Sequence, residues 1–351
     1  MDTQRLWVGL DAAVSTTSVC ILDDSGRIEH EEKCATDPDV IGNILRNAGE
    51  GRISRVCIEA GAATSVVRVL RREGFPVQIC EVKRSSKFLS IRRQKTDAND
   101  AAGLADLGRL GGAVLKDVHL KSLECQNLRT RLSARQRLLR MRKGCDGLIQ
   151  SMVRLYGGDL KLRFANGKLA ADVEPQLALL AAGGLDVEND VRPLIDMSEG
   201  LRTQLTNIDK RFAKFSEEHP VCRRFRTVPG VGPITAISFY SAIEDPSRFP
   251  RVRDVGPYLG LTPSLMQSGS YARQDSISRM GNRMTRTNLV SAATVLLSNS
   301  KTDCALKRWG EQLSDRRGRG KARVAVARKL AVLLLHLWKT GKDFDPDYGA
   351  N

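Results

Sequence analysis

The sequence has 351 residues, of which 41% are hydrophobic and 27% charged, so it is long enough for two or three domains with genuine cores. Its 56 Lys and Arg residues outnumber its 40 Asp and Glu residues, and the resulting net charge of +16 favours a polyanionic partner, nucleic acid first. Aromatic residues make up only 5%, fewer than a base-stacking platform for single strands would need. No apolar run is long enough to cross a bilayer and the first residues lack a signal-peptide pattern, so we expect no membrane partner.

The eight cysteines are scattered along the chain, and none of them forms a C-x-x-C pair. Their spacing therefore argues against a zinc site. Several of them, such as Cys20 and Cys57, lie in apolar runs where they resemble small buried hydrophobic residues. Such cysteine usage is typical of a reducing compartment, and we expect a cytoplasmic protein.

The first third of the chain has the pattern of an α/β domain. Apolar and β-branched runs predict strands at 6–10, 17–22, 27–34, 55–59 and 77–82. Helical spacing predicts helices at 38–48, 63–73, 84–92 and 96–110. Three strands followed by alternating helix and strand indicate a mixed sheet covered by helices.

The rest of the chain is mostly helical. Two long helical segments, 121–156 and 188–216, flank a glycine-spotted insert at 157–186, which favours a helical hairpin or coiled-coil arm over an ordinary helical subdomain. Beyond residue 222 the sequence is loop-rich up to about 283, with helices expected at 284–298 and 321–340. We therefore expect three parts, at 1–118, 119–218 and 219–351.

Four carboxylates stand out in the α/β part. Asp11 and Glu59 end apolar strands, where a carboxylate is costly unless a cation or hydrogen-bond donor neutralises it. Asp97 and Asp100 share a helical face with Leu104 and Leu107, so both aspartates are predicted to point toward the sheet. Four carboxylates suit Mg²⁺ or Mn²⁺ and the chemistry of phosphate esters. The plainer alternative is that Asp97 and Asp100 only favour the helix N-terminus.

A basic segment precedes the aspartate pair. Between residues 83 and 95 the chain has six cations and no acid, which would bring a phosphodiester to the acidic site unless the segment is merely a solvated face. The predicted phosphate-binding side chains are Lys83, Arg84, Lys87, Arg92, Arg93 and Lys95.

The C-terminal part offers a second set of candidates. Gly230 and Gly232 lie in a Pro-Gly-Val-Gly-Pro turn that resembles a helix-hairpin-helix phosphate site, although it also fits a plain helix connector. Segment 301–343 has twelve cations against four acids, a net charge of +8. We expect nucleic-acid contacts from Arg273, Arg279, Arg283, Arg316, Arg317, Arg319, Lys321 and Arg323. A loop serine near these arginines could attack a phosphodiester, and composition leaves five candidates open: Ser264, Ser268, Ser270, Ser276 and Ser278.

The segments "VGLDAA", "CIEAGA" and "KTDANDA" resemble the Asp-Glu-Asp-Asp domain of one insertion-sequence transposase family, often called the one-ten family, which includes the pilin-gene invertase and the bridge-RNA-guided recombinases. The segments "GLTP", "QSGS", "SRMGNRMTR" and "GRGKARVAVARKLA" resemble the C-terminal transposase domain of the same family. The resemblance extends from about residue 5 to 345. One departure is Ser264, where the family commonly has arginine, so a phosphate contact there is either missing or supplied by Arg273 or Arg279.

The resemblance implies a ribonuclease-H-like (RuvC-like) N-terminal domain with metal ligands Asp11, Glu59, Asp97 and Asp100. It also implies a nucleophilic serine that joins the DNA end covalently, which maps to Ser268 with Ser270 as the competing candidate. A dimer or tetramer, double-stranded DNA and a bridge RNA are the implied partners. The sequence leaves two other functions open: a metal-dependent junction nuclease that uses water, and a non-catalytic nucleic-acid-binding protein.

Overall fold

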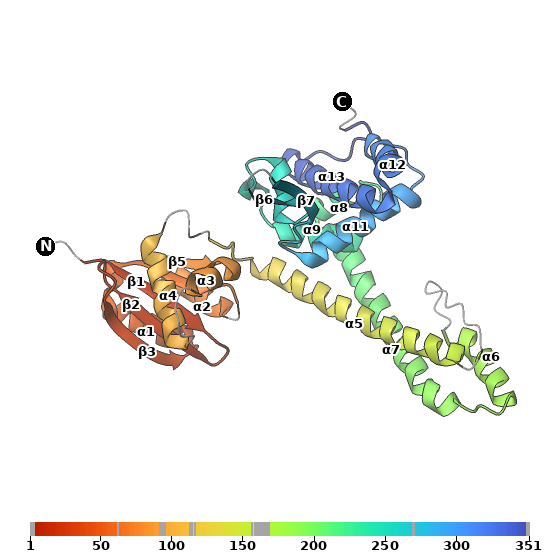
Figure 1. The fold of residues 1–351 in the computed structure, drawn as a ribbon, viewed down its shortest axis with the longest axis horizontal. Coiled ribbons are helices and arrows are strands. Elements are labelled where there is room, and N and C mark those ends of the chain that lie inside the picture. The colour runs from red at the N-terminus through yellow and green to blue at the C-terminus, as the bar shows by residue number, and fades with distance from the viewer. Residues whose placement is uncertain are drawn as a thin grey trace. The chain divides into compact units, whose positions relative to one another are not determined.

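The computed structural model describes residues 4–61, 63–90, 96–111, 115, 117–155, 157, 169–268 and 271–348. It divides into two compact units, Met1–Leu120 and Lys121–Asn351, which are described separately below. Figure 1 shows the α/β architecture of the first unit and the helical character of the second.

The first unit contains a five-stranded mixed sheet in the order β3-β2-β1-β4-β5. The central strand β1 pairs antiparallel with β2 and parallel with β4, and β5 extends the parallel side. The strands are β1 (Leu6–Ala12), β2 (Thr16–Leu22), β3 (Ile28–Ala35), β4 (Ile53–Glu59) and β5 (Val77–Cys80). All five predicted strands are therefore present, with ends within a few residues of the expected ones.

Helices cover both faces of this sheet. Side chains of α1 (Pro38–Gly49) and α2 (Thr64–Arg72) pack with alternate residues of the central strands into one apolar core. The opposite face is covered by α4 (Asp97–Leu110), with Phe88 of α3 (Val82–Leu89) packed beside it. Because both faces are covered, the central strands are apolar on both sides, as the sequence pattern indicated.

Gly9 allows α4 to lie directly on β1. A Cβ atom at this position would come within 1.9 Å of the carbonyl oxygen of Ala101 and 2.5 Å of the amide nitrogen of Ala105. Backbone therefore packs against backbone here, and only glycine leaves enough room. This contact sets the height of the helix over β1, the strand that carries Asp11.

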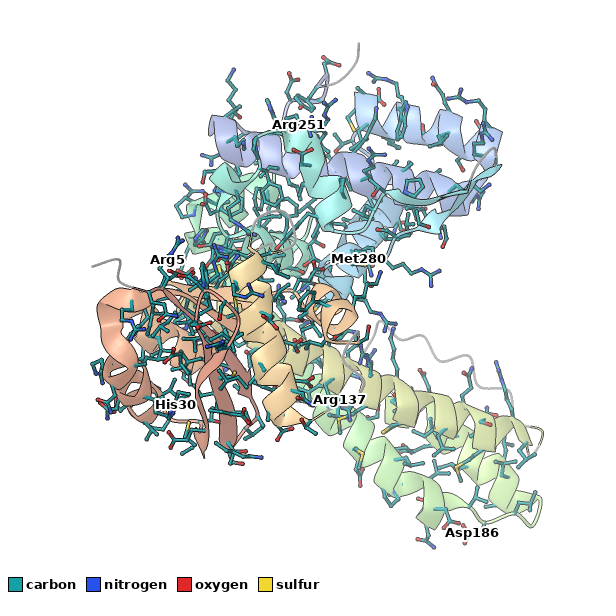
Figure 2. The ribbon with its side chains drawn as sticks, turned by 60° about the vertical axis from the view of Figure 1, so that its left-hand side comes forward. Arg5, His30, Arg137, Asp186, Arg251 and Met280 are labelled. Atoms are coloured by element: carbon teal, nitrogen blue, oxygen red, sulfur yellow. The ribbon has the colours of Figure 1, made fainter. Side chains whose placement is uncertain are left out.

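The second unit begins with a long helical arm. Helices α5 (Leu123–Leu155) and α7 (Glu188–Glu218) pack along each other, and α6 (Leu169–Ala182) completes a small core at their far end (Figure 1). Figure 2 places Arg137 along α5 and Asp186 at the end of the arm. The predicted pair of long helices is thus present, whereas α6 lies in a stretch that was expected only as a glycine-spotted insert.

The remaining helices form one large apolar core around α13. A two-stranded antiparallel hairpin, β6–β7, interrupts them. The elements are α8 (Pro220–Phe225), α9 (Pro233–Ile243), α10 (Val255–Tyr258), β6 (Pro263–Ser268), β7 (Tyr271–Ile277), α11 (Arg283–Ser298), α12 (Ala305–Arg317) and α13 (Arg319–Thr340), with short 3₁₀ turns at Pro246–Arg248 and Val252–Asp254. The sequence analysis anticipated α11 and α13, but it missed α12 and read the hairpin as loop. In the part of the chain that the structure describes, no helix is long and apolar enough to span a bilayer.

Candidate catalytic and nucleic-acid-binding sites

Asp11 and Glu59 lie at one edge of the sheet. Leu10 pairs with Ile58 on the parallel neighbour, so Asp11 and Glu59 each follow a paired residue at the carboxyl ends of their strands. Asp11 lies two residues after Gly9 in β1, and Glu59 lies two residues after Cys57 in β4, so each acid points to the same face as that earlier residue. Both Gly9 and Cys57 contact α4. The two carboxylates therefore belong to the same edge and to the face that α4 covers.

The direction of α4 brings its first residues to that edge. Near its C-terminus, Arg109 contacts the β2–β3 turn, where its guanidinium lies 3.5 Å from the carbonyl oxygen of Asp24. This turn is at the amino end of β1, so the opposite end of α4 lies where β1 ends. Thr96 caps the helix by accepting a hydrogen bond of 3.2 Å from the amide of Asn99, and Asp97 and Asp100 form the first turn. All four predicted acids are thus brought to one end of the α/β unit.

The orientation predicted for Asp97 is wrong. Its side chain is 65% exposed, and its carboxylate accepts a hydrogen bond of 2.9 Å from the ammonium group of Lys33 on β3. The reason is that Asp97 is the first residue of α4, ahead of the turns that rest on the sheet. Asp100 is half-buried, and Leu104 and Leu107 are fully buried, so the predicted face turns toward the sheet after Asp97.

The acids share an edge without forming a closed ligand set. Among the described residues, no three His, Cys, Asp or Glu side chains lie close enough together to hold a metal ion. The Lys33 ammonium group lies beside Asp97, and its hydrogen bond and charge lower the pKa of Asp97. The donors are all carboxylate oxygens, the type that Mg²⁺ and Mn²⁺ prefer.

Sequence analysis missed two residues that contact these acids. Lys33 binds Asp97, and the hydroxyl group of Ser85 donates a hydrogen bond of 2.5 Å to Glu59. Lys33 looks like an ordinary exposed strand residue, and Ser85 is one of two consecutive serines in a basic helix. Only the pairing of strands and the placement of α3 reveal their contacts.

The basic segment before α4 lies only partly within the described residues. Lys87 is exposed on α3, which agrees with a solvent-facing cation. Residues 91–95, with Arg92, Arg93 and Lys95, lie outside the described residues, as do the side chains of Lys83 and Arg84. The phosphate-binding role of this segment stays a prediction.

The serine-bearing loop is the end of a β-hairpin. Ser268 is the last residue of β6 and pairs with Tyr271, the first residue of β7. Gly269 and Ser270 lie outside the described residues, and so do the side chains of Ser268 and Arg273. Of the other candidates, Ser264 donates a hydrogen bond of 3.0 Å to the carbonyl oxygen of Ser276.

Two glycines pack the ends of this hairpin against each other. A Cβ atom on Gly260 would lie 2.2 Å from the carbonyl oxygen of Met280, and one on Gly281 would lie 2.0 Å from that of Tyr258. Both glycines have positive φ, 66° and 70°. The "YLG" and "SRMG" segments therefore cross backbone to backbone, which places the hairpin firmly on the helical core.

Arg286, a residue that sequence analysis did not single out, joins the same two segments. Its buried guanidinium donates hydrogen bonds to the carbonyl oxygens of Leu259, at 2.9 Å, and Met280, at 2.8 Å. Burial, together with the nearby charges of Arg279 and Arg283, lowers its pKa. Arg286 is thus a structural cation, whereas Arg279 and Arg283 are exposed.

The predicted basic residues near the C-terminus gather at helix termini. Arg283 begins α11, and Arg319 begins α13, with one residue between it and the end of α12. Five of the six cations in this group are exposed and Arg323 is half-buried: Arg283, Arg316, Arg317, Arg319, Lys321 and Arg323. Helix N-termini attract anions, so the positions of Arg283, Arg319 and Lys321 favour phosphate, whereas Arg316 and Arg317 lie in the last turn of α12. Arg279, Arg317 and Lys321 also line a cavity of about 1510 Å³ whose walls include Trp309 and Val324.

The two glycines of the predicted phosphate turn have different surroundings. Gly230 has a φ of 85°, and a Cβ there would lie 2.5 Å from the carbonyl oxygen of Ala292 on α11, so helix packing accounts for it. Gly232 precedes the first residue of α9, and a Cβ atom on it would have nothing within 4 Å. Only Gly232 leaves the helix N-terminus open to a ligand, and its role stays a prediction.

Two family profiles match separate parts of the chain. The profile of the Transposase IS116/IS110/IS902 family matches residues 222–309, and a profile described as Transposase, for the DEDD domain of IS110 elements, matches residues 8–156. The chain belongs to the IS110 family of insertion-sequence transposases. The DEDD match contains the acidic edge, and the other match contains the serine hairpin.

Curated relatives cover most of the chain. The transposase for insertion sequence element IS1111A of Coxiella burnetii is 27% identical over 336 residues, which is 93% of this chain and 88% of the relative. A probable family 20 transposase of Pseudomonas aeruginosa is 27% identical over 287 residues, or 80% of this chain and 82% of the relative. A putative transposase of Sinorhizobium fredii is 26% identical over 300 residues, or 82% and 74%.

Proposed function

We propose that this transposase cuts and rejoins DNA with two cooperating sites, a cation-binding acidic edge and the nucleophile Ser268. The observation that supports the proposal is that Asp11, Glu59 and the first turn of α4, with Asp97 and Asp100, lie at one edge of the sheet. Helix-terminus preference would account for the two aspartates of α4, but it does not account for carboxylates at the ends of two neighbouring strands.

The four carboxylates would hold Mg²⁺ or Mn²⁺. Their oxygen donors suit these ions, and the ammonium group of Lys33 already occupies a cation position beside Asp97. A bound divalent cation would supply charge stabilisation at the scissile phosphate. The protein's own contribution is to fix the carboxylates on rigid elements, with α4 held by its contact at Gly9.

We further infer a ribonuclease-H-like fold for the first unit. In support, a three-strand antiparallel meander precedes two parallel strands, and the central strand carries the first acid. For the whole chain we propose the parts 1–118, 119–218 and 219–351, with the arm serving oligomerisation.

In the proposed reaction the Ser268 hydroxyl group attacks the scissile phosphorus. A serine–phosphorus ester forms, the bond to one DNA oxygen breaks, and the serine proton is transferred so that the released strand ends in a hydroxyl group. A hydroxyl group of another strand then attacks the ester, which restores Ser268 and a DNA phosphodiester. The number of ester bonds is unchanged, so the exchange needs no ATP. Arg279 and Arg283, both exposed near this hairpin, suit contacts to the phosphate oxygens.

The proposed partners are double-stranded DNA, a bridge RNA that selects the target, and further copies of the chain, in the cytoplasm. The net charge of +16 and the exposed cations at α12 and α13 support a polyanion. Charge does not distinguish DNA from RNA.

The proposal is tested by replacing each acid in turn with alanine and measuring strand cleavage in Mg²⁺. Asp11→Ala, Glu59→Ala, Asp97→Ala and Asp100→Ala should each abolish cleavage while folding and nucleic-acid binding persist. Glu31→Ala, at an exposed position of β3, is the control and should cleave normally. Wild-type cleavage by any three of the four acid variants would refute the acidic site.

A further inference from the structure

Glu59 is held by a residue of another element. Ser85 on α3 is completely buried, and its Oγ donates a hydrogen bond to Glu59 Oε1 across 2.5 Å. The carbonyl oxygens of Val82 and Glu81 lie farther from the same hydroxyl group, at 3.1 and 3.2 Å. A serine has one proton to donate, and the charged, closest acceptor binds it most strongly.

We propose that Ser85 is a positioning residue that orients the Glu59 carboxylate for binding a divalent cation. This inference rests on the proposed cation-binding role of the acidic edge. A glutamate at a strand end has several rotatable bonds, and binding a cation would otherwise require ordering them. The bond from Ser85 engages Oε1 and leaves Oε2 with its acceptor capacity for a cation.

A solely structural serine would not need this contact. Helical serines commonly satisfy their hydroxyl group with a backbone carbonyl three or four residues earlier. Ser90, just after α3, does so with the carbonyl oxygen of Lys87, at 2.8 Å. Ser85 has two such carbonyls within reach, yet it makes its shortest contact with the carboxylate of Glu59 on β4.

The same contact links the acidic edge to the basic helix. Ser85 stands between the cations Arg84 and Lys87 in α3, the helix that we propose as a phosphate-binding element. Phe88 of this helix packs beside Leu104 and Leu107 of α4. The hydrogen bond therefore holds one carboxylate of the acidic edge against the helix whose cations would receive the phosphate, and outer contacts of this kind tune metal sites.

The test compares Ser85→Ala with Ser90→Ala in the full chain. Binding of Mn²⁺ is measured by titration calorimetry and by the electron paramagnetic resonance signal of free Mn²⁺, without DNA. Loss of an outer hydrogen bond to a metal ligand lowers affinity about 10- to 100-fold. We expect that loss for Ser85→Ala and wild-type affinity for Ser90→Ala. Circular dichroism and DNA binding in EDTA should stay at wild-type levels for both variants.

Two further variants decide between a positioning and a packing role. Ser85→Cys has a side chain of similar volume whose thiol is a weaker hydrogen-bond donor. The variant should therefore fold normally but bind Mn²⁺ less tightly than the wild type. In Glu59→Gln the ligand itself is lost, and adding Ser85→Ala should cause little further loss, because the two residues act as a unit. An additive second loss would show that Ser85 acts through something other than Glu59.

The outcomes separate this inference from the proposed function. If Glu59→Gln weakens Mn²⁺ binding but Ser85→Ala and Ser85→Cys do not, Ser85 has no positioning role and the acidic site stands. If the wild-type chain binds no Mn²⁺ and needs no divalent cation to cleave DNA, both proposals are overturned.

Discussion

Lys33 and Asp97 form an ion pair between an edge strand and the start of a helix, 64 residues apart in the chain. The ammonium group donates a hydrogen bond of 2.9 Å to Asp97 Oδ2, and both side chains are more than half exposed. Lys33 pairs with Ser18, which in turn pairs with Asp11, so these three residues occupy one row across the sheet. The cation therefore stands at the level of the strand that carries the first acid.

We expect the loss of the Lys33 charge to change both the pKa of Asp97 and the affinity of the acidic edge for a divalent cation. In Lys33→Met the pKa of Asp97 should rise toward its ordinary value, because the hydrogen bond and the positive charge of Lys33 lower it. A divalent cation would no longer compete with the ammonium group, so Mn²⁺ should bind several-fold more tightly. Carboxylate titration by NMR and Mn²⁺ calorimetry measure the two effects, and Lys33→Arg, which keeps the charge, should change both less.

The pH dependence of the pair has a definite sign. The pKa of Asp97 is lower in the folded state than in the unfolded state, where it is about 3.9. The ion pair therefore stabilises the folded state fully above the unfolded pKa, and this stabilisation disappears as pH falls through the folded pKa. Wild type and Lys33→Met should therefore differ slightly in stability at neutral pH and converge in strong acid. A difference that persists or grows as Asp97 is protonated would contradict this explanation.

Ser268 should become covalently linked to DNA. Ser268→Ala should retain Mn²⁺ and nucleic-acid binding and lose both cleavage and strand exchange, while Ser270→Ala should be milder. Denaturant quenching, digestion and mass spectrometry will locate the nucleotide-modified peptide. Modification at Ser270 would identify Ser270, rather than Ser268, as the nucleophile. Robust cleavage by Ser268→Ala with no adduct anywhere would instead favour a nuclease that uses water.

Nucleic-acid affinity should fall steeply with salt. For duplex DNA the logarithm of the binding constant falls with slope about −0.9 per neutralised phosphate, and six or more contacts predict a slope of about −5 or steeper. Arg317→Ala and Lys321→Ala, at exposed positions by the start of α13, should each reduce the slope by about 1. Arg251→Ala, an exposed cation elsewhere on the second unit (Figure 2), is the control. A slope near zero would refute the polyanion partner.

The arm should contribute to oligomerisation through one face of α5. Met141, Leu148 and Leu155 follow each other at seven-residue spacing and are 46%, 50% and 77% exposed. Such spacing is typical of a coiled-coil seam, and Gly144, between the first two, has open space around its Cβ position. Leu148→Lys and Leu155→Lys should lower the mass measured by light scattering, whereas Val295→Lys on α11 should not. Unchanged mass in both arm variants would exclude this face.

Residue patterns along the chain were enough to locate the elements of the α/β unit and to single out its acids. Strand and helix periodicity depend on local residue patterns, and they located all five strands, the long arm helices and the first turn of α4. Helix α12 and the hairpin β6–β7 were missed. For the hairpin, the reason is that the pairing of Pro263–Ser268 with Tyr271–Ile277 is a contact between strands, which residue periodicity does not encode.

The surroundings of the acids depend on long-range packing, which local residue patterns do not contain. The rule that places Asp97 on the face of Leu104 is correct for an ideal helix, but the first residue of α4 lies beyond the sheet and meets Lys33 instead. The bond from Ser85 to Glu59, and the crossing of Gly260 with Gly281, likewise depend on segments that are distant in sequence. Local residue patterns predict where a helix or strand forms and on which of its faces each side chain lies. The partner that each side chain finds depends on which distant segment packs beside it.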